Sequence, residues 1–552
     1  MKKNLLFILV IFSFCLAQGQ TTISGNITSN TTWTNNQVYL LSGFVRVMDG
    51  ATLTIQEGTL IKGDYDTQGT LIVERGGKLI ANGNAQQPIV FTSAKPAGID
   101  ASTGAPFRDY GDWGGVIICG RASVNQPANS ANGTAQGEAM VEGGVGSFYG
   151  GGATPNDDDN SGSLTYVRIE YGGIPFQPNS EINGLTLCGV GRGTTIDHIQ
   201  ISYVGDDAIE CFGGTVNVKH IVCYRNWDDD FDTDFGYRGH VQFGLSVRDP
   251  QIADQSGSNG FESDNDAQGN AYDPFTQPHY SNMTVVGPYT FDATINSNYK
   301  RGIHFRRNSQ ASIFNSIVTG YPVGLLIDGS TTQDNAANGL LRVQHNVLGN
   351  MTDTLATLTT AEPNNINGTF NISDFYATSG WGNETVNSVS DFAFSNVSLS
   401  SPDFTLTSGS PYNTGADFSD SYLSDSFFEQ VNYRGAFGSE NWTLGWTNWD
   451  CTNAPYLAGI TTAVAEVAAT PSVRIYPNPA NNNVNVVLAD SHNGNVQISV
   501  IDLSGKVVMT EQRTNAGRQT ISMNTSTLSN GFYFMQVTGA NGTSTQRFAV
   551  EH

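Results

Sequence analysis

Two stretches of the chain, HIQISYVGDDAIE at residues 198–210 and HIVCYRNWDDDFD at residues 220–232, are nearly the same passage written 22 residues apart. His198 corresponds to His220, and Glu210 corresponds to Asp232. A period in the low twenties, with short alternating strands and no helical pattern, is typical of a β-solenoid. Equivalent positions of successive turns then lie roughly 4.8 Å apart, which is one strand spacing. The repeat therefore predicts a coil that stacks its acidic residues in columns.

The register of this coil can be followed downstream through its apolar positions. The residues expected to point inward are Ile209, Phe231, Phe261, Ile303 and Leu325. Because side chains alternate along a strand, two outward columns follow: Glu210, Asp232, Glu262, His304 and Leu326 in the first, and Phe212, Asp234, Asp264, Arg306 and Asp328 in the second. A slip of one residue would turn both columns inward, so the predicted site depends on this register.

The expected fold class is all-β: a right-handed parallel β-helix over residues 20–457, then a small antiparallel Ig-like β-sandwich over residues 473–552. Glycine-led turns such as GATLTI and GTLIV, 19 residues apart, place the start of the coil near Trp33. Residues expected in an N-terminal capping turn are Leu40, Val45 and Val47. The aromatic residues of FGSENWTLGWTNW, at 437–449, are expected to cap the last turn, and residues 458–472 to form a linker.

The composition and the N-terminus indicate an exported protein. The 552 residues carry a formal charge of −24 with only 26 Lys and Arg. This balance argues against nucleic acid or an anionic membrane surface as a partner, because both need a cationic face. Residues 1–19, a basic start and a short apolar run, are expected to be a cleaved secretory signal that leaves Gln20 first. A lipid anchor on Cys15 fits less well because bulky Phe14 precedes it, and no other stretch resembles a transmembrane segment.

Five cysteines remain after the expected cleavage: Cys119, Cys188, Cys211, Cys223 and Cys451. An odd number without tight spacing does not indicate a disulfide framework. Cys211 and Cys223 fall at inward positions of the repeat, so we expect the cysteines to act as small buried hydrophobic residues rather than ligands or nucleophiles.

The C-terminal module resembles a known export signal. Three motifs, YPNPA at 476–480, ISVIDLSGKVV at 498–508 and LSNGFYFMQV at 528–537, look like the C-terminal sorting domain of type IX secretion substrates. The resemblance implies export to the periplasm, passage across the outer membrane through the type IX machinery, and a final place in the medium or on the cell surface. The alternative is an ordinary C-terminal adhesion sandwich.

The coil itself resembles the large β-helix cargo proteins that carry this signal. The matching stretches are WGGVIICGRA at 113–122, LTYVRIEYGG at 164–173 and YRGAFG at 433–438. This resemblance implies the fold and no particular chemistry. A weaker one is to polygalacturonases, through GDDAI at 205–209 and the following strand with Cys223. The rest of the polygalacturonase catalytic pattern is missing from the sequence, so we carry no catalytic residue over.

The outward columns place many carboxylates together. Residues 206–234 contain Asp206, Asp207, Glu210, Asp228, Asp229, Asp230, Asp232 and Asp234 against only Lys219 and Arg225. Two carboxylates one turn apart repel by roughly 1 kcal/mol in water and by about 3 kcal/mol in a partly shielded groove, so a cation or bound protons are expected. Calcium fits best because it takes six to eight oxygen ligands in irregular geometry. The residues predicted to bind it are Glu210, Asp228, Asp230, Asp232, Asp234, Glu262 and Asp264. A second candidate is the loop DDDNSG at 157–162, and the alternative for both is a solvated acidic surface.

Two functions are compatible with such columns. The favoured one is a cell-surface or secreted protein that binds glycan or another surface component, with outward aromatic residues Tyr203, Phe212, Tyr224 and Trp227 available to stack on sugars. The alternative is a calcium-dependent polysaccharide lyase or another pectin-lyase-like enzyme. The lyases this resembles use calcium to acidify a uronate C5 proton, which a basic residue removes. Arg306 would then be the base or a charge clamp assisted by His304, unless both residues only pair with neighbouring acids.

Overall fold

The computed structural model describes residues 20–128, 133–177, 180–355, 370–456, 473–488, 494–502, 506–515, 519–539 and 542–552. The chain divides into two compact units, Met1–Thr462 and Ala463–His552. The expected signal at 1–19, with Cys15, and the expected linker at 458–472 lie outside the described residues, so both stay predictions.

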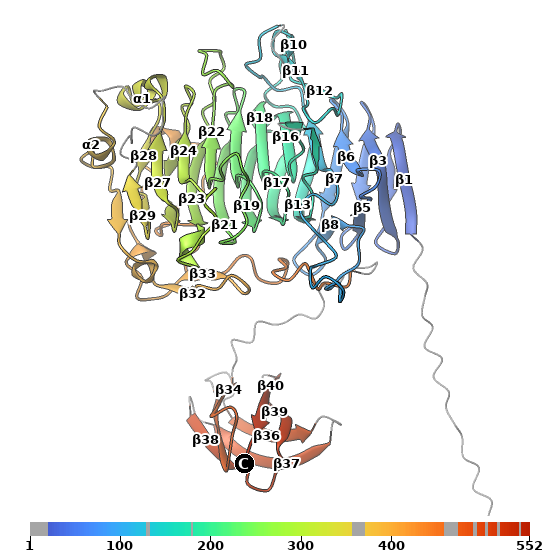
Figure 1. The fold of residues 1–552 in the computed structure, drawn as a ribbon, viewed down its shortest axis with the longest axis vertical. Helices are drawn as coiled ribbons and strands as arrows, with labels where there is room; N and C mark the ends of the chain where they lie inside the picture. The colour runs from blue at the N-terminus through green and yellow to red at the C-terminus, as the bar shows by residue number, and fades with distance from the viewer. Residues whose placement is uncertain are drawn as a thin grey trace, which may run out of the picture. The chain divides into compact units, whose positions relative to one another are not determined.

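The first unit is a parallel β-helix, which confirms the predicted fold class (Figure 1). Twenty-six of the described strands form one continuous sheet that winds into three faces. The first face contains β2 (Thr31–Trp33), β4 (Thr52–Ile55), β7 (Lys78–Asn82), β25 (Ser312–Phe314), β28 (Val343–Gln344), and the first halves of β13 (Gly162–Glu170), β17 (Thr195–Ser202), β19 (Asn217–Tyr224), β21 (His240–Val247) and β23 (His279–Val286). The second face contains the second halves of these five strands, the first halves of β1 (Gln20–Ile27) and β3 (Val38–Val47), and β5 (Leu60–Gly63), β8 (Ile89–Ser93), β26 (Ile317–Thr319), β29 (Val347–Gly349) and β31 (Glu384–Val386).

The third face is the one that concerns function. It contains the second halves of β1 and β3, followed by β6 (Thr70–Val73), β9 (Gly115–Cys119), β16 (Leu185–Val190), β18 (Ile209–Gly214), β20 (Phe231–Asp234), β22 (Phe261–Ser263), β24 (Arg301–Phe305), β27 (Val323–Ile327) and β30 (Asp353–Leu355). Short elements outside the coil are β10 (Gly133–Ala135), β11 (Glu138–Met140), β12 (Phe148–Tyr149), β14 (Pro175–Gln177), β15 (Ser180–Glu181), β32 (Phe394–Asn396), β33 (Asp403–Leu406), α1 (Ser330–Ala337) and α2 (Ile372–Tyr376).

The predicted register of the third face is confirmed. Ile209 pairs with Phe231, Phe231 with Phe261, Phe261 with Ile303 and Ile303 with Leu325. All five are buried in the core. Alternation along the strands therefore puts the neighbouring column, Glu210, Asp232, Glu262 and His304, on the outside of the coil.

The bend between the first and second faces uses the same unusual backbone conformation in turn after turn. Tyr166, His198, His220, Phe243 and Asn282 have φ between 50° and 61°, a region that side-chain-bearing residues adopt only rarely. The first four rings form a stacked ladder with centroids 4.3, 4.3 and 5.1 Å apart. This explains why both copies of the repeated passage begin with a ring-bearing residue.

The coil starts earlier than the sequence suggested. β1 pairs in parallel with β3 along both of its halves, from Gln20 to Ile27. Leu40, Val45 and Val47 therefore belong to the second layer, and Val45 and Val47 are fully buried. The prediction of a start near Trp33 with a capping turn at these residues is wrong, because β1 has few of the glycine-led apolar repeats that mark later turns.

The aromatic residues at 437–449 do not cap the last turn. After the last coil strands the chain turns back, and the return segment, defined as residues 415–456, runs along the side of the coil toward its N-terminal turns (Figure 1, orange). Gln242 and Gln200 each donate to and accept from the backbone of one of its residues, Glu429 and Asn448, at 2.7–2.8 Å. Trp446 is fully buried, and its ring meets His198 edge-on. The prediction failed because a segment without a repeat carries no signal of where it docks.

The five cysteines of the described chain are buried and form no disulfide, as predicted. The second unit is the expected antiparallel sandwich. One sheet contains β34 (Val473–Tyr476), β35 (Asn483–Leu488) and β38 (Gln519–Asn524), and the other contains β37 (Val507–Asn515), β36 (Gly494–Asp502), β39 (Gly531–Gly539) and β40 (Gly542–Val550). Val486, Ile498 and Met535 of the two sheets share one buried core. Among the described residues, no helix has the length and apolar character needed to span a membrane.

Candidate functional site

The outward side chains of the third face change from mainly apolar to mainly acidic along the coil. On β6, β9 and β16 the outward residues include the apolar side chains of Ile72, Ile117 and Cys188, beside the polar Thr186. Val141, Val145 and Tyr149 of the excursion that carries β10–β12 pack over them. Burying this apolar surface stabilises the covered half by about 25 cal/mol per Å² removed from water.

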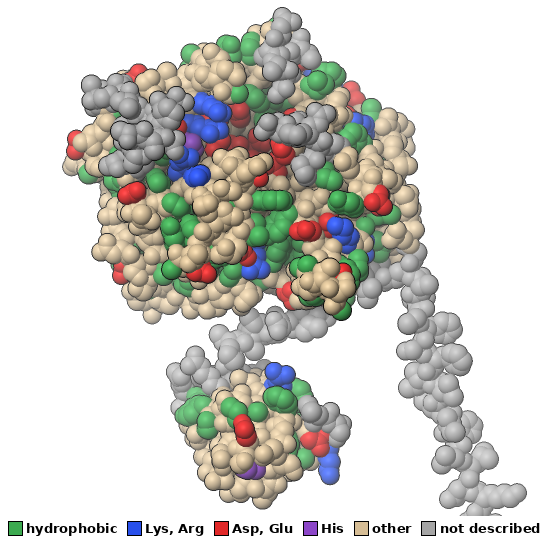
Figure 2. Space-filling model, viewed as in Figure 1, with side chains coloured by type: hydrophobic (Ala, Val, Ile, Leu, Met, Phe, Trp, Pro, Cys, Tyr) green, Lys and Arg blue, Asp and Glu red, His purple; other side chains and the backbone are tan. Residues whose placement is uncertain are grey.

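The other half of the third face is acidic. We define the acidic groove as Asp206, Asp207, Glu210, Asp228, Asp229, Asp232 and Asp234, which lie on β18, β20 and the turns before these strands. Figure 2 shows carboxylate side chains gathered in a hollow of the β-helix beside a group of cationic ones. Asp207, Glu210 and Asp229 are buried, and Asp232 and Asp234 are half-buried. The groove therefore holds its carboxylates close together with little water between them.

Within the groove two triplets of carboxylates converge. Asp206, Asp207 and Asp228 place one oxygen each within 4.8 Å of one another, and so do Asp207, Glu210 and Asp232. Asp207 belongs to both triplets, so together they form one continuous cluster. Few hydrogen-bond donors reach this cluster. Asn183 donates to Glu210, and the Asp229 N–H donates to Asp207 at 2.8 Å. Asp228 Oδ1 is buried and has no hydrogen-bond partner among the described residues.

Crowding of these carboxylates changes their acidity. Burial, then the charges of neighbouring carboxylates, raises the pKa of Asp207, Glu210, Asp232 and Asp234 well above the usual range. The pKa of Asp228 rises to about 6, mainly through burial, although Ser256 donates to it at 2.7 Å. These carboxyl groups therefore bind protons more readily than carboxyl groups in water do.

The excursion adds a carboxylate that the sequence did not reveal. Burial and the neighbouring charge of Glu181 raise the pKa of Glu142 to about 7, and Glu142 in turn raises the pKa of Glu210. Nothing in the local sequence around Glu142 signals this, because the excursion has no repeat that relates it to the coil.

Asp230 does not belong to the groove, although it was predicted as a metal ligand. Its side chain is fully buried inside the coil, 3.0 Å from the equally buried Arg248, and it accepts from Ser246. The prediction selected Asp228 and Asp230 from the run of three aspartates. These residues lie on a turn before β20 rather than on a strand, where alternation does not hold, and Asp230 points inward.

Glu262 and Asp264 stand in the predicted columns, but cationic side chains already bind them. Arg306 contacts both, with its Nε 2.8 Å from Asp264, and Arg307 lies 2.7 Å from Asp264. Burial would raise the pKa of Glu262, but Arg306 and His304 outweigh it and lower that pKa to about 2. These two carboxylates form the boundary between the groove and a cationic region, and metal binding by them stays a prediction.

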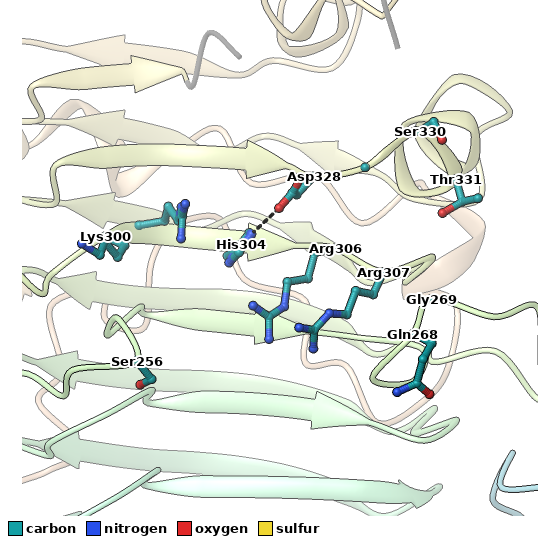
Figure 3. A pocket seen from close by; sticks show the side chains of 12 residues that line it. Ser256, Gln268, Gly269, Lys300, His304, Arg306, Arg307, Asp328, Ser330 and Thr331 are labelled. Carbon is teal, nitrogen blue, oxygen red and sulfur yellow. Dashed lines mark hydrogen bonds and ion pairs between the residues drawn. The ribbon is translucent and has the colours of Figure 1, made fainter. Parts of the chain in front are cut away.

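Beyond that boundary lies a basic pocket, which we define by Lys300, Arg301, His304, Arg306, Arg307, Asp328 and the start of α1 (Figure 3). It is an open hollow of roughly 740 Å³. His304 lies between two carboxylates, with Nε2 3.2 Å from Asp328 and Nδ1 3.5 Å from Glu262. The predicted neighbours His304 and Arg306 are therefore brought together with the acids, as the columns indicated.

The prediction of outward aromatic residues does not survive for most of them. Of the four aromatic residues expected to face solvent, Tyr203, Phe212 and Tyr224 are buried, and only Trp227 is exposed, at 38%. Phe212 lies under the excursion, and the hydroxyl of Tyr224 donates to the backbone of the return segment at Trp449. In the loop at 157–162, Asp157 accepts from Ser123 and pairs with Arg238 at 2.9 Å, so its carboxylate holds the loop to the coil. A cation in this loop stays a prediction.

These features define a class: a parallel β-helix with an acidic groove and a basic pocket on one face, joined to a small β-sandwich. Residues 25–394 match the pectate-lyase like beta helix domain, so the chain belongs to that family. Residues 474–551 match the secretion system C-terminal sorting domain, the tail of type IX secretion substrates. The protein is therefore a type IX cargo that is secreted or placed on the cell surface, and its tail is the part that addresses the type IX machinery. A search of curated proteins finds no match.

Proposed function

We propose that the protein binds a glycan or another surface component along its third face, with Ca²⁺ in the acidic groove supporting the interaction. The observation that carries this proposal is the pair of converging carboxylate triplets that share Asp207. The export tail supports it, because calcium and polysaccharides are both abundant outside cells.

Calcium suits the groove for three reasons. All of the converging ligand atoms are carboxylate oxygens, which hard divalent cations prefer. The carboxylates are crowded enough to repel, by about 3 kcal/mol for a pair one turn apart in a shielded groove, and a divalent cation would offset several such terms at once. Asp228 Oδ1 is buried and lacks a partner, so it is an oxygen that a cation would satisfy. Ligands expected from the described residues are Asp206, Asp207, Glu210, Asp228 and Asp232.

The surface next to the groove suits a sugar chain. Trp227 directly precedes Asp228, is partly exposed, and packs its ring against Tyr110 with centroids 5.8 Å apart. An aromatic face held in this way can stack on a pyranose ring. The basic pocket adjoins the same stretch, because Ser256, which lines the hollow, donates to Asp228 at 2.7 Å. A polymer lying here would therefore meet an aromatic ring, a cation site and a cationic pocket.

The lyase alternative is less well supported, because neither Arg306 nor His304 is well placed to act as a base. The charges of Glu262 and Asp264 outweigh burial and raise the pKa of Arg306, which makes it a charge clamp rather than a proton acceptor. His304 is buried, and both of its ring nitrogens face carboxylates. Binding without bond cleavage is therefore the function that this geometry favours.

A panel of polysaccharides tests the proposal. The chain from Gln20 to His552 is incubated with uronate, sulfated and neutral polymers, with calcium or with chelator, and binding is followed by affinity electrophoresis and cleavage by absorbance of unsaturated products. We expect retention that calcium strengthens and that the combined change Asp207→Asn and Asp232→Asn removes, without absorbance growth. Asp66→Asn, an exposed carboxylate outside the groove, is the matched control. Calcium-dependent absorbance growth would make the protein a lyase, and equal retention of the groove variant would reject the groove.

A further inference from the structure

We infer that Asp197, His198 and His220 form a binding site for a transition-metal ion of the zinc and copper class, which we call the histidine site. It lies at the bend between the first and second faces, and none of its residues belongs to the acidic groove or the basic pocket. Each of the three side chains places one possible ligand atom within 4.8 Å of the other two. Imidazole nitrogens suit zinc and copper, whereas calcium takes oxygen ligands. The inference therefore goes beyond the proposed function and does not depend on it.

The possible ligand atoms of the histidine site converge on a single carboxylate oxygen. Nδ1 of His198 and Nδ1 of His220 each lie 2.8 Å from Oδ1 of Asp197. Nitrogen and oxygen ligands that bind one zinc ion at about 2.1 Å lie roughly 3.0–3.4 Å from one another. Both nitrogens are thus close to ligand spacing from the oxygen, and a small separation of the side chains would let one ion replace both hydrogen bonds.

Packing of the stacked ladder does not itself require imidazole rings at these positions. The ladder continues through Tyr166 on one side and Phe243 on the other, with ring centroids 4.3 Å from His198 and 5.1 Å from His220. Both neighbours have the same left-handed backbone conformation as the histidines, so a ring without nitrogen atoms fills the same position. The imidazoles stand where the chain also supplies Asp197, which directly precedes His198. The two histidines therefore add nitrogen atoms beside this carboxylate that the ladder does not need.

The two imidazole rings are held in place by their neighbours. They stack on each other with centroids 4.3 Å apart. Trp446 and Trp442 of the return segment meet His198 and His220 edge-on, at 5.6 and 5.1 Å between centroids. Ligands that are already fixed lose little side-chain freedom when an ion binds, so less of the binding free energy is spent on ordering them.

An ion can reach the histidine site from solvent. All three side chains are partly exposed, and that of Asp197 is the most exposed, at 34%. Three protein ligands with an open side leave room for water in the remaining coordination positions. Lys219 is the next residue after Asp197 in its column, and its Nζ donates to the backbone oxygen of Phe427 at 2.8 Å. This contact ties the nearest positive charge of the column to the return segment.

Binding of Zn²⁺ tests the inference. The chain from Gln20 to His552, without an affinity tag, competes with a chromophoric zinc indicator in excess Ca²⁺, which competes for sites made of oxygen alone. We expect one zinc site, and the combined change His198→Phe and His220→Phe should weaken it by about tenfold or more. Phenylalanine already occupies the ladder at Phe243, so this change keeps the stack. Asp197→Asn, which leaves the ladder untouched, should also weaken zinc binding. His345→Phe, a half-buried histidine elsewhere on the coil, is the matched control and should bind zinc as the unchanged chain does.

Tryptophan fluorescence shows where the ion binds, because bound Cu²⁺ quenches nearby indole rings and Trp442 and Trp446 pack against the two imidazoles. We expect one equivalent of Cu²⁺ to quench part of the emission of the unchanged chain, a chelator to restore it, and the double histidine variant to keep its emission. Absence of zinc binding by the unchanged chain, equal zinc affinity of the double variant and Asp197→Asn, or equal quenching of the double variant would each overturn the histidine site. The thermal midpoint of each variant, followed by circular dichroism, shows that it is folded.

Discussion

The two halves of the third face share one register, one strand direction and one inward core, yet they carry opposite outer surfaces. In the covered half, Ile117 and Cys188 lie outside the coil but under the excursion, and the outer layer is a second apolar core. In the open half, Glu210 and Asp232 occupy outward positions on the next two turns and stand in a cluster of carboxylates. The coil therefore fixes where each outward side chain stands, and the residues packed around that side chain decide whether it is apolar or acidic.

Removing a buried charge partner should have the largest effect. Arg248→Met leaves Asp230 inside the coil without its partner at 3.0 Å, and breaking a fully buried pair in this way costs about 3–5 kcal/mol. We expect the free energy of unfolding, measured with urea and circular dichroism, to fall by that amount. Arg248→Met combined with Asp230→Asn should recover part of the loss. A loss below about 1 kcal/mol for the single variant would place Asp230 in the groove after all.

Truncating the apolar layer under the excursion, to which Phe212 of β18 also contributes, should come next. Phe212→Ala removes a ring that stacks on Phe235 with centroids 5.5 Å apart under the excursion, and large-to-small changes of buried aromatic residues cost about 3 kcal/mol or more. The same urea titration should show this loss with and without calcium. A loss that calcium reverses would mean that the covered half is not the independent apolar layer described above.

Neutralising a carboxylate in the open half should stabilise the protein in chelator, whereas the two changes above destabilise it. Asp232→Asn removes repulsion from Glu210 and Glu262, each one turn away, and should raise the free energy of unfolding in chelator by about 1–3 kcal/mol. With calcium the unchanged chain should be more stable than the variant, because it gains a bound ion that the variant binds less well. Destabilisation of the variant in chelator would show that Asp232 is stabilised by protein contacts instead.

The pH dependence should be the smallest effect and should again separate the halves. The raised pKa values of Asp228 and Glu142, about 6 and 7, mean that the folded chain binds protons more tightly than the unfolded chain. The contribution of these two carboxyl groups to the free energy of unfolding therefore falls as pH rises from about 4 to about 7. We expect the thermal midpoint in chelator to be about 1–2 °C lower at pH 8 than at pH 5, and Glu142→Gln to reduce the difference. Calcium should abolish it, and a midpoint that rises with pH in chelator would contradict the protonated groove.

The sequence predicted the parts of this molecule that repeat. The 22-residue offset and the strand alternation placed Glu210, Asp232 and Glu262 on one outward column, and the pairing of β18, β20 and β22 confirms it. This is possible in a coil because each turn repeats the hydrogen bonds of the one before, so one correct alignment fixes all the others.

The parts that could not be predicted are those without a period. Asn448 binds Gln200 from 248 positions away in the chain, and no local pattern encodes such a contact. Glu142 approaches Glu210 only because the excursion folds back over the coil. Arg307, which follows the predicted Arg306, was missed because it lies on the turn beyond β24, where the residue after an outward position also faces out.

A crystal structure grown with calcium, with anomalous differences measured at long wavelength, would test calcium binding in the acidic groove most directly. We expect a peak between Asp207, Glu210 and Asp232, with carboxylate oxygens at roughly 2.3–2.6 Å from it. A map without a peak there, in which these carboxyl groups instead hydrogen-bond to one another through shared protons, would contradict it.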